Sequence, residues 1–425
     1  MSQRIVIVGS GFAGFWAALS ARRLISLTLG EEATKIEVVV IAPDANLVMR
    51  PRLYESNPAD MRVPVEDVYR ACGVRFVYGI VDNIRAAEHE IEFVSRAGVR
   101  SAMSFDKLVL AAGSRVVRPD LPGLDSYAFS VDQFEDAIKL DGHLQSLASQ
   151  APSKARNTVV VCGGGFTGIE VATELPGRLR AIFGEGADFR VVTVDRGQDI
   201  GPDLGPGPRP HIVKALKDLG VESKLGAGVV GLDAGGVTLS SGERIETLTA
   251  IWTAGVAATP LTKQVSGEKD KFGRLHVDQD LRVPAAKDVF ATGDAASAVA
   301  DDNGHYAKMS CQHAGPLGKI AGHNAAAELL KVPTIPYSQP VYRVCLDLGG
   351  AGAVVSEGWD ARVQYTDSQA KSMKQFINTT LIYPPKANAA DAFAVADPAF
   401  DGSDPGISHP TLNSFLRENG MSLLV

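Results

Sequence analysis

Cysteine is scarce in this sequence, as are aromatic residues, long apolar runs and any excess of positive charge. The four cysteines are scattered over 425 residues without a Cys-x-x-Cys pair, so neither a disulfide framework nor a local redox pair is encoded. The net charge of -7 argues against nucleic acid as a partner. No unbroken apolar run reaches the roughly 18 residues of a membrane-spanning helix. We therefore expect a cytoplasmic protein, with peripheral contact at the inner face of a membrane as the alternative.

What the sequence does contain is a pair of glycine fingerprints. Each follows an apolar run that favours a strand, Arg4–Val8 in the first and Thr158–Val161 in the second. In a Rossmann unit such a turn lets the backbone approach a pyrophosphate, which then lies at a helix N-terminus. The glycines in question are Gly9, Gly11 and Gly14, and then Gly163, Gly165 and Gly168. A single copy would be weak support, but two copies predict two dinucleotide sites.

The order of the expected elements predicts an α/β fold with two Rossmann-type domains, the second inserted in the first, and a small C-terminal α+β domain. The first domain would comprise residues 1–118 and 255–330, and the inserted domain residues 119–254. A strand pattern that ends in small residues and a Pro-containing linker marks each passage between them. From residue 331 to 425, strand signals interrupted by proline and a helical run over 372–382 indicate the third domain.

Four segments resemble the flavoprotein superfamily of pyridine-nucleotide oxidoreductases with two dinucleotide sites. They are the two fingerprints, Leu108–Ser114, and Phe290–Ala296 with its Thr-Gly-Asp. Arg50–Tyr54 and Ile251–Val256 are similar to the type II NADH dehydrogenases, which are NADH:quinone oxidoreductases. The resemblance implies FAD on the first fingerprint and NADH on the second, with NADPH as the alternative.

The resemblance also implies roles around the FAD. Asp294 would bond the ribityl chain, since a carboxylate at a strand end can accept hydroxyl protons. Ala42 stands where an acid for the FAD ribose is expected, so either Asp44 reaches the ribose or a backbone group substitutes. The other residues assigned to the cofactor sites are Ala112, Gly113, Gly293 and Gly255.

For the nicotinamide dinucleotide, three side chains are candidates. Glu170 matches a glutamate that lies near the nicotinamide in the family; a solvated carboxylate in the first helical turns is the alternative. Asp195 ends a strand where a carboxylate would bond the ribose 2′-OH and repel a 2′-phosphate. Arg196 would instead pair with a 2′-phosphate, or lie on the surface as an ordinary arginine.

The segment Ser310–Ala321 predicts a helix that begins near the flavin. Cys311-Gln312 matches an Ala-Gln pair of the quinone reductases, but Pro316 replaces a second glutamine of that motif. Gly315-Pro316 suggests proline early in the helix, where its missing N–H would cost nothing. Gln312 and His313 are then the catalytic candidates for transfer to the acceptor, with a hydrogen-bonded structural role for His313 as the alternative. A metal site at Cys311, His313 and His323 is disfavoured because no second cluster of ligands supports it.

We therefore expect an FAD-dependent enzyme that takes hydride from NADH and passes electrons to a quinone-type acceptor. A ferredoxin-like protein is the second choice of acceptor, and a redox-sensing module of the apoptosis-inducing-factor type is an alternative from another class. A homodimer is left open. Apolar stripes occur at Met373–Leu381 and Leu412–Leu416. The first is assigned to core packing, and strong membrane anchoring is not expected because the tail has few basic residues.

Overall fold

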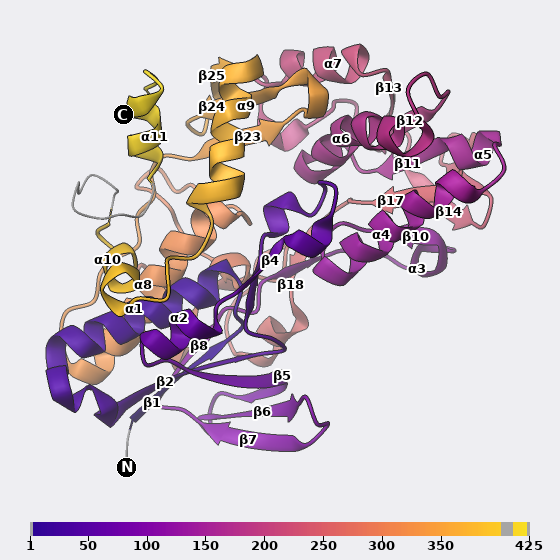
Figure 1. The fold of residues 1–425 in the computed structure, drawn as a ribbon. Helices are drawn as coiled ribbons and strands as arrows, with labels where there is room; N and C mark the ends of the chain where they lie inside the picture. Colours follow the sequence, from indigo (N-terminus) through magenta and orange to yellow (C-terminus); the bar gives the residue numbers. More distant parts are fainter. Residues whose placement is uncertain (1–2, 401–410, 423–425) are drawn as a thin grey trace.

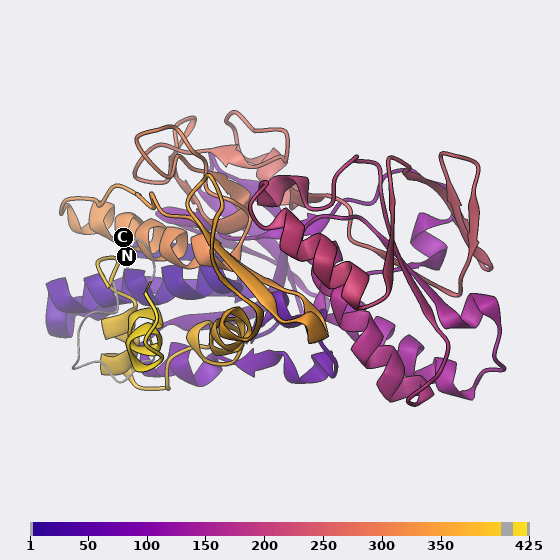
Figure 2. The same cartoon turned by 90° about the horizontal axis from the view of Figure 1, so that it is seen from above.

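The computed structural model describes residues 3–400 and 411–422 and shows two Rossmann-type sheets, each with helices on its face, and a smaller third unit (Figures 1 and 2). β1 lies inside the first sheet and is apolar on both faces because both are covered. Its residues Ile5 and Ile7 pack toward the helices, whereas Val6 and Val8 belong to the core on the opposite face. This arrangement confirms the predicted fold class.

The first sheet combines strands from both sides of the inserted domain. β1, β2, β5, β8 and β21 run parallel, and the remaining strands extend the two edges as antiparallel neighbours. In spatial order the strands are β20 (Arg282–Val283), β21 (Ala286–Ala291), β8 (Lys107–Leu110), β1 (Gln3–Val8), β2 (Ile36–Ala42), β5 (Arg75–Arg85), β6 (Glu90–Ser95) and β7 (Arg100–Ser104). A short ribbon of β3 (Asn46–Val48) and β4 (Arg62–Pro64), followed by α2 (Glu66–Ala71), lies beside this sheet.

Two long helices cover one face of this sheet and lie side by side in both views (Figures 1 and 2). They are α1 (Phe12–Leu29) and α8 (Cys311–Leu330). Glycines allow the close approach: a Cβ at Gly318 would lie 2.3 Å from the Ala13 carbonyl oxygen, and one at Gly322 would lie 2.0 Å from that of Ala17. The helix that follows the first fingerprint is thereby fixed against the helix that carries the predicted acceptor-side residues.

The second sheet is entirely parallel. Its strands are β10 (Ala128–Phe129), β17 (Thr249–Trp252), β11 (Thr158–Cys162), β12 (Arg190–Asp195) and β13 (Val221–Leu225). The accompanying helices are α3 (Leu124–Tyr127), α4 (Phe134–Ser146), α5 (Lys154–Asn157), α6 (Phe166–Phe183) and α7 (Arg209–Asp218), and a small antiparallel sheet consists of β14 (Val229–Asp233), β15 (Gly236–Leu239) and β16 (Arg244–Glu246).

The chain enters and leaves the inserted domain along one two-stranded ribbon. β9 (Ser114–Val116) pairs antiparallel with β18 (Val256–Ala258), where the sequence indicated only a linker. A second short pair joins β19 (Leu275–His276) to β22 (Ala296–Ser297). The exact domain boundaries remain predictions, but the ribbon ties both crossings to one place in the fold.

The third unit is a three-stranded antiparallel sheet with helices. It contains β23 (Arg343–Asp347), β24 (Ala353–Glu357), β25 (Arg362–Thr366) and α9 (Asp367–Phe376), followed by α10 (Ala389–Val395) and α11 (Leu412–Glu418). The apolar stripe around Met373 lies in its core, as predicted, and Met373 is buried. The stripe at Leu412–Leu416 packs against the same core, with the rings of Phe376 and Phe415 stacked at 4.5 Å.

Candidate functional site

The first fingerprint forms an open cradle at the N-terminus of α1. Gly9 has φ 109°, and a Cβ there would lie 2.4 Å from the Ala111 carbonyl oxygen; a Cβ at Gly14 would lie 2.0 Å from that of Gly9. A Cβ at Gly11 would meet nothing within 4 Å. Gly11 is also the N-cap and offers no side-chain cap, so the first N–H groups of the helix are free to bind an anion. These features fit a pyrophosphate.

The second fingerprint repeats this geometry at the N-terminus of α6. A Cβ at Gly163, whose φ is 131°, would lie 2.7 Å from Thr253 Oγ1, and one at Gly168 would lie 1.8 Å from the Gly163 carbonyl oxygen. A Cβ at Gly165 would again meet nothing within 4 Å, and this N-cap also lacks a side-chain cap. The outer glycines of each fingerprint thus permit backbone packing, and the middle glycine leaves space for a ligand.

Asp294 lies at the carboxyl edge of the first sheet, just after β21. Ser114 Oγ donates to Asp294 Oδ2 at 2.5 Å, and Arg50 Nη1 lies 3.4 Å from the same oxygen. Arg50 also forms an ion pair with Asp132 of the inserted domain. Sequence reasoning assigned Arg50 no role of its own, because its partners become neighbours only in the folded protein.

Other predicted FAD-site residues lie along the same edge. Ala112 and Gly113 follow β8, and Gly293, with φ 59°, precedes Asp294 and packs against Ala13. Asp44 is half-buried after β2, and its Oδ1 accepts hydrogen bonds from Asn46 N at 3.1 Å and Asn46 Nδ2 at 2.8 Å. Asp44 thus closes a local turn, while its second oxygen has no hydrogen-bond partner within that turn.

Asp195 is held at the end of β12 by backbone donors. Gly164 N donates to its Oδ2 at 2.6 Å, and Gly197 N donates to its Oδ1 at 2.7 Å. The carboxylate is therefore tied directly to the second fingerprint. Arg196 is exposed, and Gly255 lies exposed with φ 80° in the turn after β17.

Glu170 on α6 is buried in an ion pair with Lys374 on α9, whose Nζ lies 2.8 Å from Glu170 Oε1. The Asp347 backbone N–H donates to the same oxygen at 3.0 Å. The alternative of a solvated carboxylate is therefore wrong, because the third unit covers this turn of the helix. Sequence reasoning missed Lys374 as the partner, because the two residues belong to separate units of the fold.

The surroundings of this pair determine which of the two side chains titrates near neutral pH. Burial raises the pKa of Glu170 to about 7 although Lys374 acts in the opposite direction. Glu170 raises the pKa of Lys374, so the lysine is cationic throughout the neutral range. Lys371 forms a second ion pair with Asp347 at 2.6 Å, and burial raises the pKa of Glu174 to about 7.

The start of α8 corrects one prediction. The helix begins at Cys311 with Ser310 as N-cap, so Pro316 lies inside the helix and not in its first turn. Without an N–H, Pro316 leaves the Gln312 carbonyl unbonded within the helix. Gln339 Nε2 donates to that carbonyl at 3.4 Å instead. The proline therefore frees a backbone acceptor, and the loop before β23 supplies its donor.

Gln312 and His313 both contact the third unit. Arg343 N donates to Gln312 Oε1 at 3.3 Å, and the His313 ring lies 5.1 Å from that of Tyr342. His313 is fully buried; its Nδ1 is 3.0 Å from Ser310 Oγ, and its Nε2 has no hydrogen-bond partner among the described residues. Burial lowers the pKa of His313 to about 4, so its imidazole is neutral at physiological pH.

Cys311, the first residue of α8, is reached by the electrostatic effects of Asp294, Glu170 and Lys374, one from each of the three units. Burial raises the pKa of this thiol. All four cysteines are free. Across the described ranges, no group of three or more His, Cys, Asp or Glu side chains has the arrangement of a metal site.

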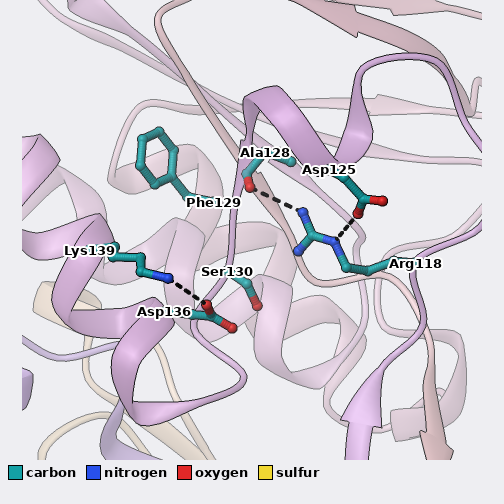
Figure 3. A pocket seen from close by; sticks show the side chains of 7 residues that line it. All are labelled: Arg118, Asp125, Ala128, Phe129, Ser130, Asp136 and Lys139. Atoms are coloured by element: carbon teal, nitrogen blue, oxygen red, sulfur yellow. Dashed lines mark hydrogen bonds and ion pairs between the residues drawn. The ribbon is translucent and has the colours of Figure 1, made fainter.

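A separate cavity of about 400 Å³ lies on the inserted domain, beside the end of β10 (Figure 3). Arg118 and Asp125 form an ion pair at one side of it, and Lys139 and Asp136 form another. None of the predicted site residues lines this cavity. The cavity therefore lies apart from the glycine cradles. It also differs from them in chemistry, because its charged side chains already pair with each other.

The match to a known family covers both cradles. The sequence model of the pyridine nucleotide-disulphide oxidoreductase family matches residues 3–316 of this chain. The chain belongs to this family. As a member of the pyridine nucleotide-disulphide oxidoreductases it is an oxidoreductase, and its relatives include NADH dehydrogenases and NADH:quinone oxidoreductases. The resemblance derived from the sequence is confirmed.

Two curated relatives and one solved structure illustrate the relationship. An NADH dehydrogenase-like protein of Mycobacterium tuberculosis is 44% identical over 93% of this chain and 98% of its own length. A type II NADH:quinone oxidoreductase of Staphylococcus saprophyticus is 25% identical over 90% of this chain and 95% of its own. NDH2 from Plasmodium falciparum, solved in complex with NADH, shares the fold, with a TM-score of 0.74, 14% identity and coverage of 93% and 97%.

Within residues 3–400 and 411–422, none of the helices is both long enough and apolar enough to span a bilayer.

Proposed function

We propose that this protein is an FAD-dependent NADH dehydrogenase that reduces a quinone-type acceptor. The observation that carries the proposal is the repeated cradle: Gly11 and Gly165 each face open space at an uncapped helix N-terminus. Two such cradles, one in each Rossmann-type domain, suit one FAD and one NADH. Bound FAD would accept hydride from NADH and pass the electrons onward.

The residues of the chain would bind and orient these groups. Gly9, Gly11 and Gly14 would hold the FAD pyrophosphate and Asp294 its ribityl hydroxyls, with Ser114 and Arg50 fixing the carboxylate. Asp44 is the nearest carboxylate for the FAD ribose. Asp294 would need little further ordering on binding, since two donors already hold it.

On the NADH side, Gly163, Gly165 and Gly168 would hold the pyrophosphate, and Asp195 would bond the adenosine ribose. The Gly164 N–H fixes one carboxylate oxygen of Asp195, and each oxygen keeps a lone pair for a hydroxyl donor. A 2′-phosphate there would meet this negative charge, which favours NADH; the exposed Arg196 is the feature that would allow NADPH.

The quinone is supported by the relatives named NADH:quinone oxidoreductases. The acceptor side would be the region where the start of α8, with Gln312 and His313, meets the third unit. Glu170, paired with Lys374 on the helix after the second fingerprint, would lie near the nicotinamide and supply charge and a proton there. A ferredoxin-like acceptor remains the alternative because Pro316 replaces a glutamine of the quinone-reductase motif.

Three measurements on the purified protein test the proposal. FAD content is determined after denaturation, the flavin is titrated with NADH without oxygen, and steady-state rates are compared for quinones, a ferredoxin and oxygen. We expect a yellow protein with one FAD per chain, bleaching by NADH, and the highest kcat/KM with a quinone. Bleaching without rapid reoxidation by any acceptor would point to a redox sensor, and a clear preference for ferredoxin would overturn the quinone assignment.

A further inference from the structure

The hydroxyl of Tyr54 is buried at the junction of the three units and has no hydrogen-bond partner. Tyr54 is 4% exposed, and its Oη is among the buried polar atoms that lack a partner in the described structure. A buried hydroxyl left without a partner costs roughly 1 to 3 kcal/mol, so native proteins pair such groups with protein, water or ligand. The position of this hydroxyl therefore points to a molecule outside the chain.

The surroundings of Tyr54 connect it to the second cradle. Lys374 Nζ lies 5.9 Å from the centre of the Tyr54 ring and 5.8 Å from that of Phe166, the first residue of α6. Lys374 also pairs with Glu170, four residues further along the same helix. Tyr54 is consequently close to the start of α6, where the second fingerprint would hold NADH, and to α9 of the third unit.

The backbone of this segment is fixed, so the hydroxyl is held in place. Arg178 on α6 donates to the Tyr54 carbonyl at 3.0 Å and pairs with Asp141 on α4 at 2.5 Å. Glu55, the next residue, accepts a hydrogen bond from Asn378 Nδ2 at 3.0 Å. The segment between β3 and β4 is thus attached to both of the other units, and Figure 1 shows β4 between the two lobes.

The charges nearby restrict the kind of ligand atom. Burial, together with the carboxylates of Glu170, Asp347, Glu55 and Glu174, raises the pKa of Tyr54 well above its usual value. The hydroxyl is therefore neutral and available as a donor. A neutral oxygen beside an apolar ring is the acceptor that matches a buried, neutral hydroxyl donor.

We infer that Tyr54 Oη donates a hydrogen bond to a carbonyl oxygen of a ring-bearing substrate at the flavin site. This inference rests on the proposed function, which supplies two sources of such an oxygen: the carboxamide of the nicotinamide and the carbonyl of a quinone acceptor. Either way Tyr54 is a residue that orients a substrate through one hydrogen bond. The sequence placed it in the Arg50–Tyr54 motif but gave no role to its hydroxyl.

The test compares Tyr54→Phe with the parent and with Tyr78→Phe. Tyr78 donates to Glu66 at 2.7 Å at the surface, so its variant controls for the loss of a phenol that has a protein partner. Binding of NAD+ and of menadione to the oxidised holoprotein is measured through the flavin spectrum, together with the Tm of each protein with and without ligand. We expect Tyr54→Phe to maintain or raise the ligand-free Tm, because it removes the unpaired hydroxyl, and to weaken binding of one ligand about threefold to tenfold.

The outcomes distinguish the nicotinamide carboxamide from the quinone carbonyl. They also distinguish the role of Tyr54 from the proposed function itself. Weaker binding of NAD+ alone assigns the carboxamide, and weaker binding of menadione alone assigns the acceptor. Unchanged binding of both ligands, or a lowered ligand-free Tm with both affinities reduced in proportion, overturns the inference. Failure of NADH to bleach the parent flavin would instead refute the proposed function, because that result does not involve Tyr54.

Discussion

Glu170 and Lys374 form a buried ion pair at 2.8 Å although 204 residues separate them in the chain. Glu170 belongs to the helix after the second glycine fingerprint, and Lys374 belongs to the third unit. The pair therefore places a cation of the C-terminal region beside the proposed NADH site. Removing one partner would leave an uncompensated charge in the interior, which typically costs about 3 to 5 kcal/mol.

The pH dependence of stability should report this pair. Because the pKa of Glu170 rises from 4.5 to about 7 on folding, the folded state binds this proton more tightly than the unfolded state. The contribution of Glu170 to stability is therefore greatest below pH 4.5 and declines as the pH rises toward 7. In thermal unfolding measured from pH 5 to pH 7.5, the Tm of the parent relative to that of Glu170→Gln should fall as the pH rises.

A difference in stability between the parent and Glu170→Gln that grows over the same pH range would contradict the raised pKa of Glu170. The double variant Glu170→Gln with Lys374→Met serves as the control, because it removes both charges. We expect it to be more stable than Glu170→Gln alone.

Gly11→Val should abolish FAD binding without unfolding the protein. A Cβ at Gly11 would meet no protein atom within 4 Å, so the new side chain would extend into the space proposed for the pyrophosphate. Gly14→Ala is the contrasting variant, since its Cβ would lie 2.0 Å from the Gly9 carbonyl oxygen and should lower the Tm. FAD per chain and Tm are measured for both; a Gly11→Val protein with full FAD content would refute the assignment of this cradle.

Asp195→Asn should reduce the preference for NADH over NADPH at least tenfold in kcat/KM. A hydrogen bond to a charged group contributes about 1.5 to 3 kcal/mol, and the substitution also removes the charge that would repel a 2′-phosphate. Arg196→Ala is the matched control on the neighbouring, exposed residue and should leave the rate with NADH unchanged. A parent enzyme that prefers NADPH would show that Arg196 decides the choice.

Gln312→Ala and His313→Ala should slow reoxidation of the flavin by the acceptor but not its reduction by NADH. Both side chains join the start of α8 to the third unit, whereas NADH is expected from the inserted domain. Loss of one preorganised donor near a developing charge typically costs about a hundredfold in rate. Stopped-flow traces measure flavin reduction and flavin reoxidation separately. If both rates are unchanged and only the Tm falls, the two residues have a structural role and no role in electron transfer.

The sequence by itself determined the fold class, the family and the two cradles. These follow from local features: an apolar run, glycines at fixed spacing and a helix start are neighbours in the chain, and the backbone geometry they impose does not depend on distant residues. The core stripe around Met373 was likewise readable from its helical period alone.

Only the tertiary structure decided which side chains share the interior. The burial of Glu170, its partner Lys374, the attachment of Arg50 to Asp294 and the unpaired hydroxyl of Tyr54 depend on contacts between separate units. Pro316 shows the same limit: its spacing suggested a helix start, but Ser310 provides the cap and Gln339 satisfies the carbonyl that the proline leaves free. Such pairings depend on packing and desolvation between distant parts of the chain. A single amino-acid sequence does not show which of its distant residues the fold brings together.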